Sequence, residues 1–276
     1  EARQGIADYV AAARAEGRVL KEMTAPKGGT FIAPTVLKVA GIAEMSREIF
    51  GPVLHVATFK AGEIDAVVRA VNATGYGLTF GLHTRIDDRV QAVVDALTVG
   101  NTYVNRNQIG AVVGSQPFGG EGLSGTGPKA GGPEYLTRFT RSATPAVGQD
   151  DRETPETEVA ASLRLDRITV HPPHMLVLPG PTGESNQLSF VPRAPVLCLG
   201  PSAATALAQA EAVRALGGHA VEAPGLTPLA LTRLNGFSGA IWWGDAEGAR
   251  ARSKALAERQ GPILPLIGTL PDSAHA

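Results

Sequence analysis

Helical and strand patterns alternate along the first hundred or so residues of the chain. Apolar positions recur at helical spacing in three segments, which predicts helices at 2–16, 63–72 and 87–97. Short alternating or apolar runs predict strands at 18–23, 31–39, 54–59, 76–84 and 101–105, and the strand at 54–59 is expected to be buried. A short helical turn is expected to begin at Ser46, a plausible N-cap, and to stop before Pro52. This alternation favours an α/β fold with a mostly parallel sheet.

A second series of elements begins near residue 167. Strands are expected at 168–170, 176–178 and 187–191, the last two forming a hairpin or flap around a turn rich in Gly and Pro. Further strands are expected at 195–199, 219–222, 237–243 and 263–267, with helices at 203–216 and 245–259. Ser202 is the expected N-cap of the first of these helices. Together these elements predict a small Rossmann-like domain. Its first turn, GPSAAT, lacks the spacing of a nucleotide-binding loop, so we expect no catalysis there.

The stretch between the two series is poor in apolar residues. Residues 141–166 are rich in Thr, Ser, Glu, Asp and Pro, which is typical of a linker. An ordered excursion such as an oligomerisation arm is the alternative. The chain is therefore expected to contain a domain at 1–140, a linker or arm at 141–166 and a second domain at 167–276.

A glycine-rich run, NQIGAVVGSQPFGGEGLSGTGPKAGGP, follows the strand expected at 101–105. It has few residues that could anchor a helix, and glycine permits close backbone approach. We therefore expect a shaped loop that offers backbone N–H groups to a small ligand. Phe118, between Pro117 and Gly119, is the large apolar side chain near its middle. Lys129 and Arg106 could add positive charge, although such residues are ordinary on protein surfaces.

Composition narrows the class of protein. The 276 residues are 43% hydrophobic and 18% charged, with a net charge of −1, so nothing indicates nucleic acid or an anionic membrane as a partner. A single cysteine, Cys198, excludes an intrachain disulfide and suits a reducing cytoplasm. It lies in the apolar run PVLCLG, where we expect a buried and unreactive thiol. No signal peptide or membrane span is expected, and the start without Met suggests a piece of a longer polypeptide.

Two motifs resemble one family. The segment from NTYVN to the end of the glycine-rich run, together with EIFGP at 48–52, resembles L-glutamate γ-semialdehyde dehydrogenases of the aldehyde dehydrogenase superfamily. The resemblance covers residues 1 to about 140 and is closest to the versions fused in bifunctional proline utilization A proteins. LPGPTGESN and WWGD resemble the noncatalytic C-terminal domain of the longer members, which has an aldehyde-dehydrogenase-like fold.

The resemblance implies roles for five residues. Glu48 would bind the ribose of the nicotinamide in NAD, and Phe50 would contact the nicotinamide itself. Backbone N–H groups of Gly110 and Ala111 would hold the α-carboxylate of glutamate semialdehyde, and Phe118 would pack on the substrate's aliphatic stem. Family members often have Ser where Ala111 stands, a change that leaves the backbone donor intact.

The resemblance also implies what lies outside this chain. The nucleophilic cysteine, the general base and most of the NAD-binding domain are upstream in the family, so no catalytic residue and no metal site is expected here. A fused FAD-dependent proline dehydrogenase, a channel capped by the C-terminal domain and a homo-oligomer are further implications. Two alternatives remain open: a catalytically inactive module for binding or assembly, and a monofunctional dehydrogenase with an unusual tail.

Overall fold

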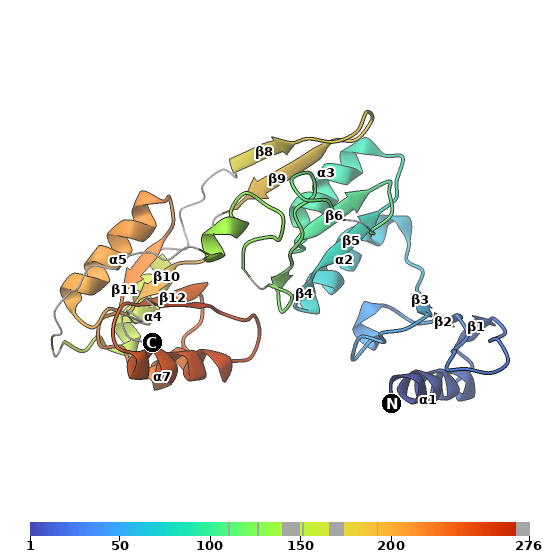
Figure 1. Ribbon diagram of the computed structural model, residues 1–276, viewed down its shortest axis with the longest axis horizontal. Helices are drawn as coiled ribbons and strands as arrows, with labels where there is room; N and C mark the ends of the chain where they lie inside the picture. Colours follow the sequence, from blue (N-terminus) through green and yellow to red (C-terminus); the bar gives the residue numbers. More distant parts are fainter. Residues whose placement is uncertain are drawn as a thin grey trace. The chain divides into compact units, whose positions relative to one another are not determined.

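The computed structural model describes residues 1–109, 111–125, 127–139, 150, 152–165, 174–191 and 193–268 (Figure 1). By its internal contacts the chain forms two compact units, Glu1–Gln108 and Ile109–Ala276. The glycine-rich run thus groups with the second unit, whereas the sequence pattern suggests a boundary near residue 140. The expected strand at 168–170 lies outside the described residues.

The first unit opens with a helix and a three-stranded sheet. Helix α1 (Ala2–Ala15) buries Val10 and Ala13 and is followed by Gly17, whose φ of 70° is the left-handed conformation that suits a residue just after a helix. Strands β1 (Val19–Glu22) and β2 (Thr35–Lys38) are antiparallel, and β2 is parallel to β3 (Val53–Val56). These elements confirm the predicted helix and strands.

Two expectations in this region are wrong. No helical turn begins at Ser46; a 3-10 turn, η1 (Ile42–Glu44), precedes it instead. The few residues between Ser46 and Pro52 are too short a stretch to offset the cost of starting a helix. Strand β3 is also not buried, because it is the edge of its sheet and leaves Leu54 60% exposed.

The remainder of the first unit pairs two helices with two parallel strands. The elements are η2 (Ala61–Glu63), α2 (Ile64–Ala73), β4 (Tyr76–Gly77), β5 (Thr79–Leu82), α3 (Asp87–Ala96) and β6 (Asn101–Val104). Strands β5 and β6 run parallel, and Val68, Leu82 and Val93 form a small core between helices and strands. Asn72 ties α2 to the end of α3, because its side chain donates to the carbonyl of Ala96 at 2.8 Å.

The second unit contains the predicted Rossmann-like sheet. Its elements are β10 (Val196–Cys198), α5 (Ala203–Ala215), β11 (Ala220–Glu222), α6 (Pro228–Arg233), β12 (Gly239–Trp242), α7 (Ala246–Ala257) and β13 (Leu266–Gly268). The strands are all parallel in the order β11-β10-β12-β13. Ser202 caps α5 as predicted, since its hydroxyl accepts a hydrogen bond from the Thr205 N–H at 3.1 Å.

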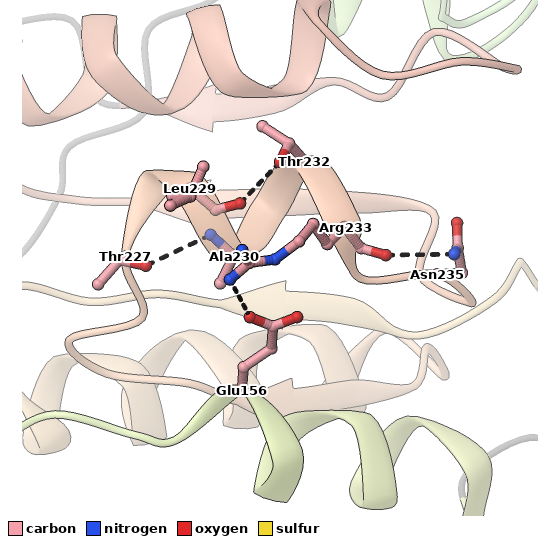
Figure 2. A network of polar contacts seen from close by, with 7 residues as sticks. All are labelled: Glu156, Thr227, Leu229, Ala230, Thr232, Arg233 and Asn235. Carbon is pink, nitrogen blue, oxygen red and sulfur yellow. Dashed lines mark hydrogen bonds and ion pairs between the residues drawn. The ribbon is translucent and has the colours of Figure 1, made fainter.

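A helix occupies part of the segment where the composition predicts a linker. Helix α4 (Glu156–Leu165) buries Val159 and Leu163 in the core of the Rossmann-like sheet. Figure 2 shows how Glu156 at its start pairs with Arg233 of α6, with Nη2 and Oε2 2.7 Å apart. For residues 156–165 the linker interpretation is therefore corrected: two apolar residues one turn apart are enough to dock a helix.

The predicted hairpin precedes the parallel sheet. Strands β8 (His174–Leu178) and β9 (Asn186–Phe190) are antiparallel, with Leu176 opposite Leu188. The glycine-rich run contributes β7 (Glu121–Gly122) and leads into η3 (Tyr135–Phe139). Among the described residues, no helix is both long and apolar enough to cross a membrane.

Candidate functional site

The glycine-rich run folds back on itself into a closed loop, residues 109–133, which we call the anchor loop. Phe118 and Ala130 exchange both backbone hydrogen bonds, at 3.0 and 2.8 Å. A third bond joins the Gly114 N–H to the carbonyl of Gly131 at 2.9 Å. These bonds hold the two limbs of the loop together without help from a helix.

A row of backbone donors is left open at the start of the anchor loop. The exposed residues Ala111, Val112 and Val113 give their N–H groups to no other described residue. Consecutive unpaired N–H groups on a curved backbone form a site for an anion. Ala111 belongs to this row, and its role in carboxylate binding stays a prediction; Gly110 lies outside the described residues.

Phe118 is held firmly by its neighbours. The backbone bonds to Ala130 fix its position, and Pro117 before it is buried. A Cβ added to Gly119 would lie 3.2 Å from the Cα of Lys129, a tight contact, so glycine eases the close approach of the two limbs. The ring of Phe118 is partly exposed and can offer an apolar wall to a bound molecule.

Lys129 strengthens the same closure. Its ammonium group donates to the carbonyl of Gly119 at 2.7 Å. Burial lowers the pKa of Lys129, and the nearby negative charge of Glu121 opposes that shift. The side chain of Lys129 therefore mainly stabilises the closed conformation of the loop, and its charge lies next to Gly119, the residue after Phe118.

The two residues assigned to cofactor binding lie in the first unit, just before β3. Glu48 is exposed, and its carboxylate accepts no hydrogen bond from any described residue. Phe50 is 88% exposed, which is unusual for a phenylalanine in a folded protein. A carboxylate with open acceptors and an exposed ring suit a ribose diol and a nicotinamide, so these residues fit the cofactor that the resemblance implies.

Cys198 is unsuited to nucleophilic chemistry. It is fully buried in β10, which lies between β11 and β12 in the parallel sheet. Burial raises the pKa of the thiol to about 12, so the reactive thiolate is scarce at neutral pH. This confirms the prediction of a buried thiol in a central strand. Within the described part of the chain, no cluster of His, Cys, Asp or Glu could hold a metal ion.

One contact of the anchor loop could not be expected from the sequence. The side-chain amide of Gln116 donates to a carboxylate oxygen of Glu184, in the turn between β8 and β9, at 2.8 Å. The two residues are 68 positions apart, and no local pattern links them. Their only sequence signal is that each lies in a motif of the resemblance, QPFGG and PTGESN.

Comparison with known proteins gives consistent matches. The model of the aldehyde dehydrogenase family matches residues 1–144. The bifunctional protein PutA of Klebsiella aerogenes is 36% identical over 97% of this chain, which spans only 24% of that relative. A 1-pyrroline-5-carboxylate dehydrogenase of Bacillus cereus is 43% identical over 50% of this chain and 27% of its own length.

Solved structures of such proteins also match. Proline utilization A of Bradyrhizobium japonicum is 51% identical over 50% of this chain and 14% of its own, with a TM-score of 0.49. The chain thus spans about a quarter of the length of the full-length curated relatives that it matches almost throughout. Because the family model covers 144 of its 276 residues, the chain belongs to the aldehyde dehydrogenase family.

Proposed function

We propose that this chain is the C-terminal part of an NAD-dependent L-glutamate γ-semialdehyde dehydrogenase that acts in the catabolism of proline to glutamate. The observation that carries the proposal is the row of open N–H groups at Ala111–Val113 beside Phe118 in the closed anchor loop. The relatives support it, since they are named as 1-pyrroline-5-carboxylate dehydrogenases and as bifunctional PutA proteins.

The substrate has two features that the anchor loop can bind. Its α-carboxylate needs several hydrogen-bond donors, and we propose that the N–H groups of Gly110 and Ala111 would supply them. Its short aliphatic stem needs an apolar surface, and Phe118 supplies that. Backbone donors carry no proton that titrates near neutral pH, so the carboxylate would be held without an acid–base group.

The cofactor would be held from the first unit. Glu48 would accept hydrogen bonds from the hydroxyls of the nicotinamide ribose, and Phe50 would cover one face of the nicotinamide. When bound, NAD⁺ supplies the chemistry of hydride acceptance. This chain's own residues would bind and orient the cofactor and the substrate, and the nucleophilic cysteine and the general base would come from another part of the intact protein.

The rest of the proposal concerns the intact protein. We infer that it resides in the cytoplasm and also carries an FAD-dependent proline dehydrogenase, as the name "bifunctional" of its relatives suggests. The Rossmann-like second domain would cap a channel between the two active sites and take no part in catalysis. The burial of Cys198, the one cysteine of this sequence, supports a noncatalytic role.

The substrate half of the proposal is tested by Phe118→Ala in the intact protein. Loss of the apolar wall should raise the KM for the semialdehyde by about 10–100-fold, the effect of losing the burial of a short stem, and leave the KM for NAD⁺ nearly unchanged. Phe31→Ala, which removes another partly exposed ring, is the matched control and should change neither. Equal effects of Phe118→Ala on both constants would refute the assignment.

The cofactor half is tested by Glu48→Ala. This variant should raise the KM for NAD⁺ and leave the KM for the semialdehyde close to that of the wild type. Unchanged NAD⁺ kinetics would show that Glu48 does not contact the ribose. A wild-type intact protein that binds NAD⁺ but oxidises no aldehyde would favour the inactive binding or assembly module instead.

A further inference from the structure

We propose that Glu184, in the turn of the β8–β9 hairpin, is a positioning residue that holds the anchor loop in its binding conformation through Gln116. The proposal rests on the function proposed above, because the anchor loop is taken to bind the semialdehyde. It assigns to the hairpin a role in substrate affinity.

Gln116 links the two parts of the anchor loop that are proposed to bind the substrate. It lies between the open N–H groups at 111–113 and Phe118, so its position affects both halves of the candidate site. Its own N–H donates to the carbonyl of Val112 at 2.7 Å, which closes a tight turn. The side chain then leaves the loop and donates through Nε2 to Glu184 Oε1 at 2.8 Å. A hydrogen bond to a carboxylate is stronger than one between neutral groups.

The side-chain amide of Gln116 depends on this bond. Its Oε1 atom is buried and has no hydrogen-bond partner among the described residues. Without Glu184, both polar ends of a largely buried amide would lack partners, which is a costly arrangement. The side chain would then turn toward solvent and pull the backbone on either side of it.

The hairpin turn is built to keep the Glu184 carboxylate in place. The same Oε1 accepts a second bond from Asn186 Nδ2 at 3.0 Å, and Asn186 also donates to the carbonyl of Pro179. The Glu184 N–H donates to the carbonyl of Pro181 at 3.0 Å. A Cβ on Gly180 would lie 2.7 Å from Asn186 Nδ2, so a side chain there would displace the amide. Contacts within the turn therefore fix the Glu184 carboxylate without any contribution from Gln116.

A second link joins the residues just after β9 to the anchor loop. Arg193 pairs with Glu121, with Nη2 and Oε2 3.3 Å apart. Both side chains are well exposed, so this pair contributes little by itself. In the loop sequence, however, the two links lie on either side of Phe118. The segment that carries Phe118 thus has one link to the hairpin turn, through Gln116, and a weaker one to Arg193 just after β9, through Glu121.

Fixing this segment matters because of its composition. A glycine-rich backbone loses much conformational entropy when it is ordered. If the loop is ordered before the substrate arrives, that loss does not reduce the binding affinity. We therefore expect the loss of the Gln116–Glu184 bond to weaken binding of the semialdehyde while NAD⁺ binding, which uses the first unit, stays the same.

The test uses the intact protein and the variants Glu184→Ala, Gln116→Ala and their combination. Each single change should raise the KM for the semialdehyde about tenfold, and the double variant should be no worse than either single one, because both remove one bond. The KM for NAD⁺ should not change. Glu211→Ala, an exposed glutamate on α5, is the matched control and should behave as the wild type.

Two further readouts separate positioning from general damage. Glu184→Gln keeps an oxygen that can accept from Gln116 Nε2 and should restore the KM to within about threefold of the wild type. Hydrogen–deuterium exchange should quicken in peptides covering 111–119 of Glu184→Ala and stay unchanged in β10–β13. If Glu184→Ala fails to fold, Gln116→Leu, which keeps the shape without the donor, carries the same test.

The proposal is overturned if Glu184→Ala matches Glu211→Ala in both KM and exchange, or if the effects of the two single variants multiply in the double variant. Failure of the proposed function looks different. In that case the wild-type protein would not oxidise the semialdehyde, while the exchange experiment would still report whether Glu184 orders the anchor loop.

Discussion

At the scale of single residues, one contact of His55 links two elements of the first unit. Its Nε2 lies 2.8 Å from the hydroxyl of Tyr9, which ties β3 to α1. The pKa of His55 is lowered from its ordinary value near 6.5, first by burial and then by the positive charge of Arg18. The folded first unit thus favours the neutral imidazole, which can accept the tyrosine proton.

The stability of the first unit should therefore depend on pH. Because the unfolded state binds the proton more readily, the contribution of neutral His55 is fully present above pH 6.5 and is lost as the pH falls through the lower pKa of the folded state. Urea denaturation followed between pH 5 and 7.5 should show this loss. His55→Gln, which cannot titrate, should flatten the dependence, whereas exposed His83→Gln should keep it. Equal pH dependence in both variants would contradict this account.

Residue roles differ in how far the sequence could predict them. The buried thiol of Cys198 follows from an apolar run of strand type, and the structure confirms it. The bond between Gln116 and Glu184 depends on how a distant hairpin docks, which no local pattern encodes. The same holds for Tyr9 and His55, which come from different elements 46 positions apart.

At the scale of elements, α4 gives the sharpest prediction. Leu163 is 1% exposed in the core beneath the parallel sheet, so Leu163→Ala should lower the free energy of unfolding of the second unit by about 2–5 kcal/mol. Glu156→Ala removes only an exposed ion pair with Arg233, which water screens, and should change the free energy of unfolding far less. Urea denaturation of both variants measures the difference. Equal and small losses would mean that α4 is not part of this core.

The strongly periodic elements were predictable, and the short or weakly apolar ones were not. Helix α4 was missed because only two of its residues are buried, and its polar composition resembles that of a linker. Helix α6 was missed because it has six residues, although Thr227 as N-cap and Pro228 at the first position were readable signals. At Ser46 the sequence has a capping signal but no helix forms, because a cap without a following apolar stripe cannot stabilise a helical turn.

At the scale of the whole molecule, the α/β class and the parallel Rossmann-like sheet follow from alternating strand and helix patterns. The domain limits at 1–140, 141–166 and 167–276 remain a prediction, because the contacts divide the chain after Gln108. The first unit exposes several large apolar residues, including Phe50, Leu54 and Phe59. We expect Leu54 and Phe59 to be covered by other groups in the intact protein, whereas Phe50 is the ring proposed to cover the nicotinamide.

The central claim is that backbone N–H groups of the anchor loop bind the α-carboxylate of the substrate. The most direct measurement compares kcat/KM of the intact protein for L-glutamate γ-semialdehyde and for butanal, which has the aldehyde and stem without the carboxylate and amine. It is made for the wild type, Ala111→Ser and Ala111→Pro. The account predicts a strong preference for the semialdehyde that Ala111→Ser keeps. Ala111→Pro, which lacks the N–H donor, should reduce that preference at least about tenfold. A folded Ala111→Pro variant with undiminished preference, or a wild type with none, would contradict it.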